Sequence, residues 1–155
     1  MNRRKQNKMP ILKIKKLNEN ARIPSRATEG SAGMDLYSAE SESITINPHE
    51  CKKIHTGIAV QLESPDYAAF VYARSGTAIK HGVAPANCVG LIDSDYRGEI
   101  ICGLVNQFDI PYTVEPGERI AQLVIAPVII PEIEIADELD ETDRGAGGFG
   151  STGKK

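Results

Sequence analysis

The frequency and spacing of turn-forming residues constrain the fold of this chain more than any other feature. Its 155 residues include 14 glycines and 9 prolines, which separate short segments rich in apolar and β-branched side chains. Frequent turn residues between short segments of this kind are typical of an all-β sandwich or barrel. Strands are predicted at 11–17, 43–46, 51–62, 67–73, 99–106 and 119–130, and one short helix at 75–81.

The length predicts a single domain, since domains commonly hold about 100–200 residues. No apolar run approaches the roughly 20 residues that span a bilayer, and the basic start lacks the apolar segment of a secretory signal. We therefore expect a cytoplasmic protein with no membrane partner. Cys51, Cys88 and Cys102 are widely spaced and form no CxxC motif, which predicts reduced, buried thiols rather than a disulfide framework or a zinc site.

The net charge of −3 is unevenly distributed along the chain. Residues 1–16 contain seven Lys or Arg and no acid, which leaves 11 basic and 21 acidic residues, or −10, in the remainder. An acidic body is a poor surface for nucleic acid. The basic tail could contact nucleic acid or an acidic partner, but a solvated terminus is the favoured interpretation.

The last third of the chain contains two unusual segments. The run at 124–130 is too apolar for a solvent-facing strand, which predicts burial inside the sandwich or against another subunit. Residues 137–143 hold five acids, and residues 144–153 hold five glycines, so this end cannot build a core. Composition alone favours neither of two interpretations of this end: a mobile tail, or an arm that clamps phosphates and a base.

The segment 87–101 is the first candidate for chemistry. Two apolar arms flank Asp-Ser-Asp-Tyr-Arg-Gly, which predicts a β-hairpin with carboxylates at its tip. Alternation would place Asp93 and Asp95 on one face and Tyr96 on the other. An aspartate in a turn commonly bonds its own backbone, which accounts for Asp95. Asp93 follows Leu91 and Ile92 inside the arm, where a carboxylate requires a chemical reason.

Two further segments carry candidate polar groups. Arg74 and Ser75 lie where a strand meets a helix start, a place that attracts anions, although Ser75 alone is explained as an N-cap. Asp35 follows a glycine turn and could serve a hard cation, but a single carboxylate is weak evidence of a metal site.

Taken together and in order, five segments resemble the five motifs of the trimeric dUTP pyrophosphatase (dUTPase) family. They are Ala32–Leu36, Ala73–Gly76, Gly90–Gly98, Gly117–Leu123 and Arg144–Gly153. The resemblance implies an all-β, single-domain β-barrel or jelly-roll-like fold of the β-clip type with one short helix, assembled as a homotrimer with shared active sites. It divides the chain into a basic tail at 1–10, a β domain at 11–136, and an acidic linker with a Gly-rich arm at 137–155 that closes over substrate.

The same resemblance implies an activity. The family hydrolyses dUTP to dUMP and pyrophosphate, which limits uracil in DNA and supplies dUMP for dTMP synthesis. Asp93 would orient the water that attacks the α-phosphorus. Asp35 would reach the cofactor Mg²⁺ through water while the triphosphate chelates the ion, a mode that suits a metal that dehydrates reluctantly.

The remaining implied roles concern substrate binding. The phosphate contacts from the body of the protein would be Arg74, Ser75, Gly76 and Gln122. Uracil would bind the backbone around Asn87, Gly90, Leu91, Ile92 and Ile101, and Tyr96 would pack under the deoxyribose. From the arm, Phe149 would stack over uracil, while Arg144, Gly150, Ser151 and Thr152 would complete the phosphate contacts.

Two other functions are compatible with this fold. The first is dCTP deamination, against which the intact Asp93–Tyr96 segment and the Phe149 arm argue. The second is a non-catalytic nucleotide-binding regulator, since fold alone does not determine function. The presence of both Asp93 and Arg144 argues against the loss of catalysis. None of these functions requires nucleic acid as a partner.

Overall fold

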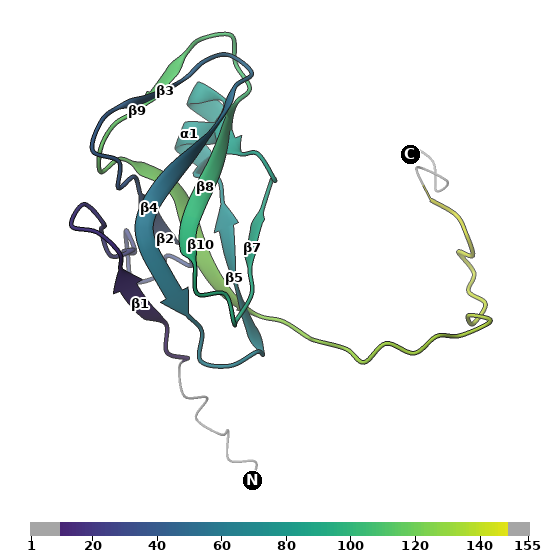
Figure 1. Cartoon of the computed structure of the whole chain (residues 1–155). Coiled ribbons are helices and arrows are strands. Elements are labelled where there is room, and N and C mark those ends of the chain that lie inside the picture. Colours follow the sequence, from purple (N-terminus) through teal and green to yellow (C-terminus); the bar gives the residue numbers. More distant parts are fainter. Residues whose placement is uncertain (1–9, 149–155) are drawn as a thin grey trace.

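The computed structural model describes residues 10–148, which form two four-stranded antiparallel sheets, a two-stranded ribbon and one short helix (Figure 1). The first sheet has the order β1 (Lys13–Lys16), β4 (Cys51–Gln61), β8 (Glu99–Asn106) and β6 (Val83–Pro85). The second has the order β2 (Met34–Tyr37), β10 (Arg119–Pro127), β5 (Tyr67–Tyr72) and β7 (Gly90–Ile92). The ribbon pairs β3 (Ile44–Ile46) with β9 (Tyr112–Val114), and α1 spans Ser75–His81.

The core lies between the two sheets because their strands alternate inward and outward side chains. In β8, Ile100, Cys102 and Leu104 are buried, while Ile101 between them is exposed. Leu36 of β2 and Leu123 of β10 meet them in the same apolar cluster. Full burial of an aliphatic side chain of this size contributes about 1.5–3 kcal/mol, so the cluster holds the sheets together.

The predicted all-β class and the single helix are confirmed within the described residues, and the sheets stay open rather than closing into a barrel. The predicted helix bounds agree with α1, which ends at His81 and is followed by the C-cap residue Gly82, whose positive φ of 69° closes the last turn. Strands β2, β6 and β9 were not predicted, because each has only three or four residues and their pairing partners are distant in sequence. No helix in residues 10–148 is long and apolar enough to cross a membrane.

The apolar run near the C-terminus is not buried inside the sandwich of this chain. Strand β10 ends at Pro127, and Ile129 and Ile130 are 90% and 73% exposed. Beyond Pro127, the described residues form neither helix nor strand and lead away from the sheets (Figure 1). The prediction of burial within the sandwich is therefore wrong for the end of this run, and burial against another subunit stays a prediction.

The prediction that the three cysteines are buried is correct only for Cys102. Burial raises the pKa of the Cys102 thiol to about 12. Cys51 and Cys88 are free and exposed. Cys51 occupies an outward position at the start of β4, and Cys88 lies in a turn with a φ of 62°. The side-chain type alone could not reveal which side of a strand or turn each thiol occupies.

Candidate functional site

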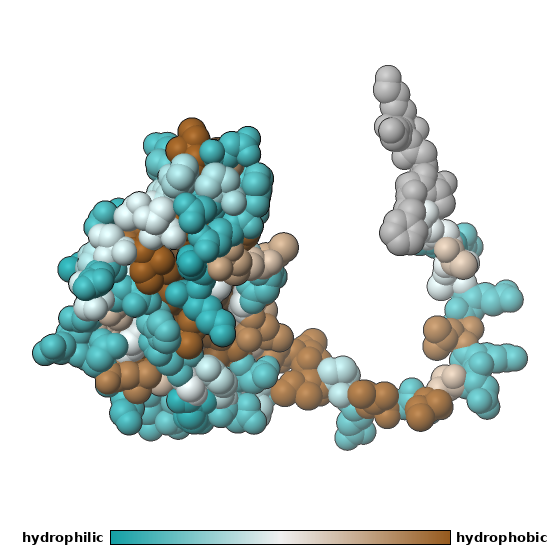
Figure 2. Space-filling view, turned by 45° about the horizontal axis from the view of Figure 1, so that its top comes forward, coloured by the Kyte–Doolittle hydropathy of each residue, from teal (hydrophilic) through white to brown (hydrophobic). Residues whose placement is uncertain are grey.

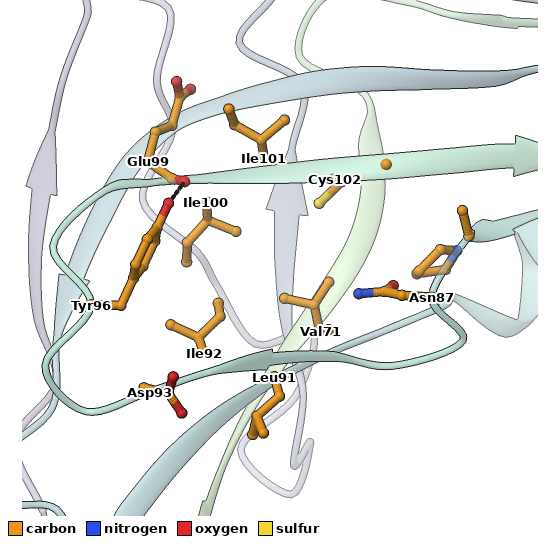
Figure 3. A pocket seen from close by; sticks show the side chains of 14 residues that line it. Val71, Asn87, Leu91, Ile92, Asp93, Tyr96, Glu99, Ile100, Ile101 and Cys102 are labelled. Atoms are coloured by element: carbon orange, nitrogen blue, oxygen red, sulfur yellow. Dashed lines mark hydrogen bonds between the residues drawn. The ribbon is translucent and has the colours of Figure 1, made fainter.

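A cavity of about 420 Å³ opens between β7 and β8, where the two sheets separate (Figure 3). Strand β7 pairs with β5 alone. In the described structure, the residues of β8 from Glu99 to Cys102 have no ladder partner on the β6 side, because β6 pairs with Leu104–Asn106 and the Ala86 amide that follows it donates to the Gly103 carbonyl. The cavity is thus bordered by strand edges at which some main-chain N–H and C=O groups are not hydrogen-bonded to a neighbouring strand. Such edges can offer both donors and acceptors to a planar polar ligand.

The predicted β-hairpin at this place is wrong. Strands β7 and β8 belong to different sheets, and the segment Asp93–Gly98 crosses from one to the other. The chain also reverses within it, since the Tyr96 amide donates to the Asp93 carbonyl at 3.2 Å. The strand alternation used to place Asp93, Asp95 and Tyr96 therefore does not hold across this turn.

Asp93 lies directly after β7 at the rim of the cavity (Figure 3). Its side chain is exposed, and it has no hydrogen-bond or ion-pair partner among residues 10–148. Beside it, the buried side chain of Ile92 points into the space between β7 and β8, whereas Leu91 is 62% exposed and its side chain points away from β8 (Figure 3). Both carboxylate oxygens of Asp93 are available to accept hydrogen bonds from a water molecule.

Tyr96 lines the cavity at the same end as Asp93 (Figure 3). Its hydroxyl donates to the main-chain carbonyl of Glu99 at 3.0 Å, and its ring is 45% exposed. A Cβ on Gly98 would lie only 2.4 Å from the Tyr96 hydroxyl oxygen and 2.6 Å from the ring carbon that bears it. Gly98 therefore determines where this ring can lie. The motif contained Gly98, but sequence reasoning assigned it no role.

At the other end of the cavity, Asn87 occupies the turn between β6 and β7. The side-chain nitrogen of Asn87 lies 3.6 Å from the position that a Cβ on Gly90 would take, and the Val71 Cβ lies 3.1 Å from it. The absence of a side chain at Gly90 lets this turn pack close to β5. Ile101 borders the cavity from β8, with its exposed side chain on the opposite side of the strand from Ile100 and Cys102 (Figure 3).

A second polar cluster lies outside this cavity, around Asp35 of β2 in the second sheet. Arg74 Nε donates to Asp35 Oδ1 at 2.9 Å, and Arg119 Nη1 donates to Asp35 Oδ2 at 3.2 Å. The Asp35 side chain is 14% exposed, against 25% for Arg74 and 50% for Arg119. Two cations around one carboxylate leave a net positive cluster that suits an anion. Sequence reasoning did not single out Arg119.

Gln122 joins this cluster from β10. Its backbone lies opposite Asp35 on one side and Tyr72 on the other, and its Nε2 donates to the Ala73 carbonyl at 2.8 Å. A Cβ on Gly33 would lie 2.5 Å from the Gln122 side-chain oxygen, so glycine at this position makes room for the amide. This hydrogen bond fixes the main chain of Ala73, the residue directly before Arg74.

The helix start beside Arg74 differs from the expectation for Ser75. The N-cap residue of α1 is Arg74, without a side-chain cap bond, and Ser75 is the first helical residue. The interpretation of Ser75 as an N-cap is therefore wrong. Ser75 and Gly76 are both exposed, which leaves their polar groups accessible.

The predicted site residues thus form two groups in one chain. Asp35 and Gln122 lie on strands of the second sheet and Arg74 directly precedes α1, and none of them lines the cavity that holds Asn87, Asp93 and Tyr96. Arg144 is exposed and donates from Nε to its own segment, at the Gly147 carbonyl, at 2.9 Å. The other predicted arm residues lie outside the described residues: Phe149, Gly150, Ser151 and Thr152.

The donor set around Asp35 fits an indirect contact with a metal ion. Within residues 10–148, no group of three or more His, Cys, Asp or Glu side chains could hold a metal directly. Each Asp35 oxygen accepts one arginine donor, yet a carboxylate has about four acceptor sites, which leaves room for metal-bound water. Contact through water is also the mode that magnesium commonly adopts.

Comparison with known proteins agrees with this arrangement. A family model described as dUTPase matches residues 19–153. The deoxyuridine 5'-triphosphate nucleotidohydrolase of Desulfitobacterium hafniense is 53% identical over 85% of this chain and 87% of its own length. The protein of the same name from Polynucleobacter asymbioticus is 46% identical over 94% of this chain and 99% of its own.

Solved structures show the same relationship. A mutant of the Staphylococcus bacteriophage 80alpha dUTPase with dUpNHpp has a TM-score of 0.83 and 31% identity, covering 92% of this chain and 98% of that one. A mutant of the dUTPase from phage phi11 of S. aureus, described with a structural Mg(II) ion, has a TM-score of 0.75 and 27% identity, covering 84% and 99%. The chain therefore belongs to the dUTPase family.

Proposed function

We propose that this chain hydrolyses dUTP to dUMP and pyrophosphate, the activity named for its relatives. The observation that carries the proposal is the cavity between β7 and β8, with Asp93 at its rim and Tyr96 on its wall. By consuming dUTP, the reaction limits uracil in DNA, and its product supplies dUMP for dTMP synthesis.

Uracil binds between the open strand edges, among Asn87, Gly90–Ile92 and Ile101. A uracil ring has two carbonyl acceptors and one N–H donor on its pairing edge, and main-chain groups of a rigid strand can match all three. Tyr96 packs under the deoxyribose and leaves no space for a 2′-hydroxyl. Its position is determined by the 3.0 Å bond to the Glu99 carbonyl and by Gly98, which supports strong discrimination against ribose.

Asp93 holds the attacking water. The water oxygen bonds to the α-phosphorus, a proton passes toward the Asp93 carboxylate, and the bond from the α-phosphorus to the bridging oxygen breaks to release pyrophosphate. The exposure of Asp93 and its lack of partners in the described residues support this role. Alignment of water, phosphorus and leaving group supplies most of the catalysis.

The positive cluster on the second sheet binds the phosphates. Arg74, with Ser75 and Gly76 at the start of α1, contacts phosphate oxygens, and Gln122 contributes a polar contact beside them. Asp35 orients Arg74 and Arg119 and accepts hydrogen bonds from metal-bound water. Mg²⁺, when bound to the triphosphate, neutralises charge on the phosphates and the leaving pyrophosphate.

A homotrimer brings the two groups of residues together. One chain keeps Asp35 and Arg74 apart from the cavity, so a complete site uses segments from neighbouring subunits. Apolar residues appear in brown where the chain leaves the body and at intervals beyond it (Figure 2). They include Ile129, Ile130, Ile133 and Ile135, which are 73–95% exposed. Exposed apolar residues in this number are typical of a surface covered by a partner.

The residues after the β domain at 11–136 form an acidic linker and a Gly-rich arm at 137–155. In this proposal Arg144 and Phe149 reach the γ-phosphate and the uracil face, with Gly150, Ser151 and Thr152 completing the phosphate contacts. Closure of the arm excludes water and strengthens the charged contacts. The enzyme works in the cytoplasm and requires neither membrane nor nucleic acid.

The test is pyrophosphate release from dUTP, dTTP, dCTP and UTP, with and without Mg²⁺. We expect dUMP and pyrophosphate from dUTP alone, and stimulation by the metal. Ammonia release from dCTP would support the deaminase alternative and contradict the proposal. Tight binding of dUTP without turnover would support the regulatory alternative. Sedimentation of the same sample tests the trimer.

A further inference from the structure

The antiparallel ladder between β4 and β8 is interrupted beside the cavity. The register shifts between His55 and Ala59, and Gly57 in this bulge has a φ of 65°, a conformation that favours glycine. A bulge leaves main-chain groups without their usual partners. Here the Glu99 side chain takes that place, since its Oε1 accepts the Gly57 amide at 2.7 Å.

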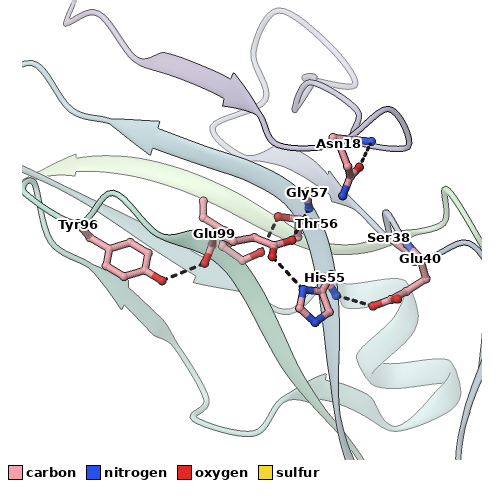
Figure 4. Close-up of polar contacts among 10 residues, drawn as sticks. Asn18, Ser38, Glu40, His55, Thr56, Gly57, Tyr96 and Glu99 are labelled. Carbon is pink, nitrogen blue, oxygen red and sulfur yellow. Dashed lines mark hydrogen bonds and ion pairs between the residues drawn. The ribbon is translucent and has the colours of Figure 1, made fainter.

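Two further side-chain contacts close the same gap (Figure 4). Glu99 Oε2 lies 2.9 Å from His55 Nδ1, and Thr56 Oγ1 donates to the Ile100 carbonyl at 2.5 Å. Between the ladder pairs His55–Ile101 and Ala59–Glu99, side chains thus hold β8 to β4, at the point where β8 borders the cavity. The position of this backbone depends on whether those contacts are made.

Glu99 connects the bulge to the wall of the cavity. Its side chain fills the bulge, and its main-chain carbonyl accepts the Tyr96 hydroxyl at 3.0 Å. The residues that follow Glu99 in β8, Ile100 to Cys102, also line the cavity. A shift of Glu99 would therefore displace the Tyr96 ring and the β8 edge together.

His55 is the titratable partner in this arrangement. Its imidazole faces Glu99 of β8, and its amide donates to Glu40 Oε1, after β2, at 2.8 Å. The hydrogen bond to Glu99 raises the pKa of His55 above 6.5, and the charge of Glu40 acts in the same direction, while burial and the charge of Lys53 on β4 oppose the shift. His55 is about half exposed, and the Glu99 side chain is 21% exposed.

We propose that Glu99 is a positioning residue for the sugar and base pocket and that protonated His55 holds it in place. The proposal rests on the proposed dUTP hydrolysis, because its tests measure the KM for dUTP and the preference for dUTP over UTP. Neither residue contacts the reacting atoms. Their loss therefore weakens substrate binding and discrimination rather than the chemical step.

The effect of pH follows from the raised pKa of His55. Below that pKa, imidazolium and carboxylate pair and the pocket is held; above it, the charge on His55 is lost and the contact weakens. We expect the KM for dUTP to rise about threefold through this transition, the size that a partly exposed ion pair supports. NMR of the ring carbons gives the transition of His55 directly, since the chain has only 3 histidines.

Three variants separate charge from shape. Glu99→Gln keeps an acceptor for the Gly57 amide but removes the negative charge. The KM for dUTP should therefore rise about threefold, while kcat stays within about twofold of the wild type. The pKa of His55 should fall toward 6.5. His55→Ala should have the same raised KM at every pH. His55→Asn keeps a neutral donor that does not titrate, so its KM should match that of the wild type above the pKa of His55 and should not change with pH. In Glu99→Gln and His55→Ala the preference for dUTP over UTP should fall.

His49→Ala is the matched control. His49 forms a similar contact with Asp109 at 3.0 Å, but both side chains are exposed and neither lines the cavity. This variant should keep the KM and its pH profile unchanged. A wild-type KM that stays constant while His55 titrates, or a His55→Ala enzyme with normal KM and discrimination, would overturn the proposal. Absence of dUTP turnover by the wild type would instead contradict the proposed function, while the shift of the His55 pKa in Glu99→Gln would still test the contact.

Discussion

Asp35 and Arg74 form an ion pair, with 2.9 Å between Oδ1 and Nε, that joins β2 to the start of α1. The second oxygen of Asp35 accepts Arg119 from β10, so one carboxylate links three segments. Because Asp35 is mostly buried, its charge cannot be removed without leaving two guanidinium groups poorly compensated. The same residue thus contributes to stability and to the shape of the proposed phosphate site.

Replacing this carboxylate tests both contributions. Asp35→Asn should lower the free energy of unfolding by about 1–2 kcal/mol, less than the loss of a fully buried pair because Arg119 is half exposed. It should also raise the Mg²⁺ concentration needed for half-maximal activity. Urea unfolding and a metal titration measure the two effects. Asp109→Asn, at an exposed pair with His49, is the control and should change stability by less than about 0.5 kcal/mol.

The role of Asp93 predicts a loss of turnover without a loss of binding. Asp93→Asn should bind dUTP normally in calorimetry, while kcat falls by at least about 100-fold, since the amide cannot accept a proton. Asp95→Asn, two residues further in the same turn, should keep kcat within about threefold. Normal turnover by Asp93→Asn would remove Asp93 from the mechanism.

Gly98 predicts a change in sugar discrimination. The Cβ introduced by Gly98→Ala would lie 2.4 Å from the Tyr96 hydroxyl oxygen, so the ring must move from its place. We expect the ratio of kcat/KM for dUTP over UTP to fall about tenfold. At Gly30 a Cβ would meet nothing within 4 Å, so Gly30→Ala should leave the ratio unchanged. An unaltered ratio in Gly98→Ala would show that the ring position does not select the sugar.

The thiols should differ in reactivity. Cys51 and Cys88 are exposed, whereas burial raises the pKa of Cys102 to about 12, so its thiolate is scarce near neutral pH. Mass spectrometry after brief alkylation of the folded protein should find two modified cysteines, and a third only in denaturant. Rapid modification of Cys102 in the folded protein would contradict the packing of β8.

Removal of the Gly-rich arm tests its proposed closure over substrate. A chain that ends at residue 143 should sediment as the full-length protein does, because the apolar residues at 129–135 remain. Its turnover of dUTP should fall by at least about 100-fold, as the phosphates lose charged contacts and shielding from water. Full activity of the shortened chain would show that the arm is an ordinary tail.

Local patterns were sufficient for the long elements of this fold. The helix over Ser75–His81 and the strand over Glu99–Asn106 have the predicted bounds. Each is encoded by neighbouring residues, through helical propensity before a C-cap glycine in the first case and alternating burial in the second. Among the individual motifs, only Asp93 was a polar group that a purely structural role explains poorly, whereas Asp35 and Arg74 gained their interpretation from the ordered set of five motifs.

The amino-acid sequence alone therefore determined the class of fold, the family resemblance and the residue types available for chemistry. Only the tertiary structure decided that β7 and β8 join different sheets, which opens a cavity where a hairpin was expected. It also decided that Glu99 fills the bulge at Gly57 and that Arg119 shares Asp35 with Arg74. These contacts join residues 42 and 84 positions apart, and no local pattern encodes which distant partner completes a hydrogen bond.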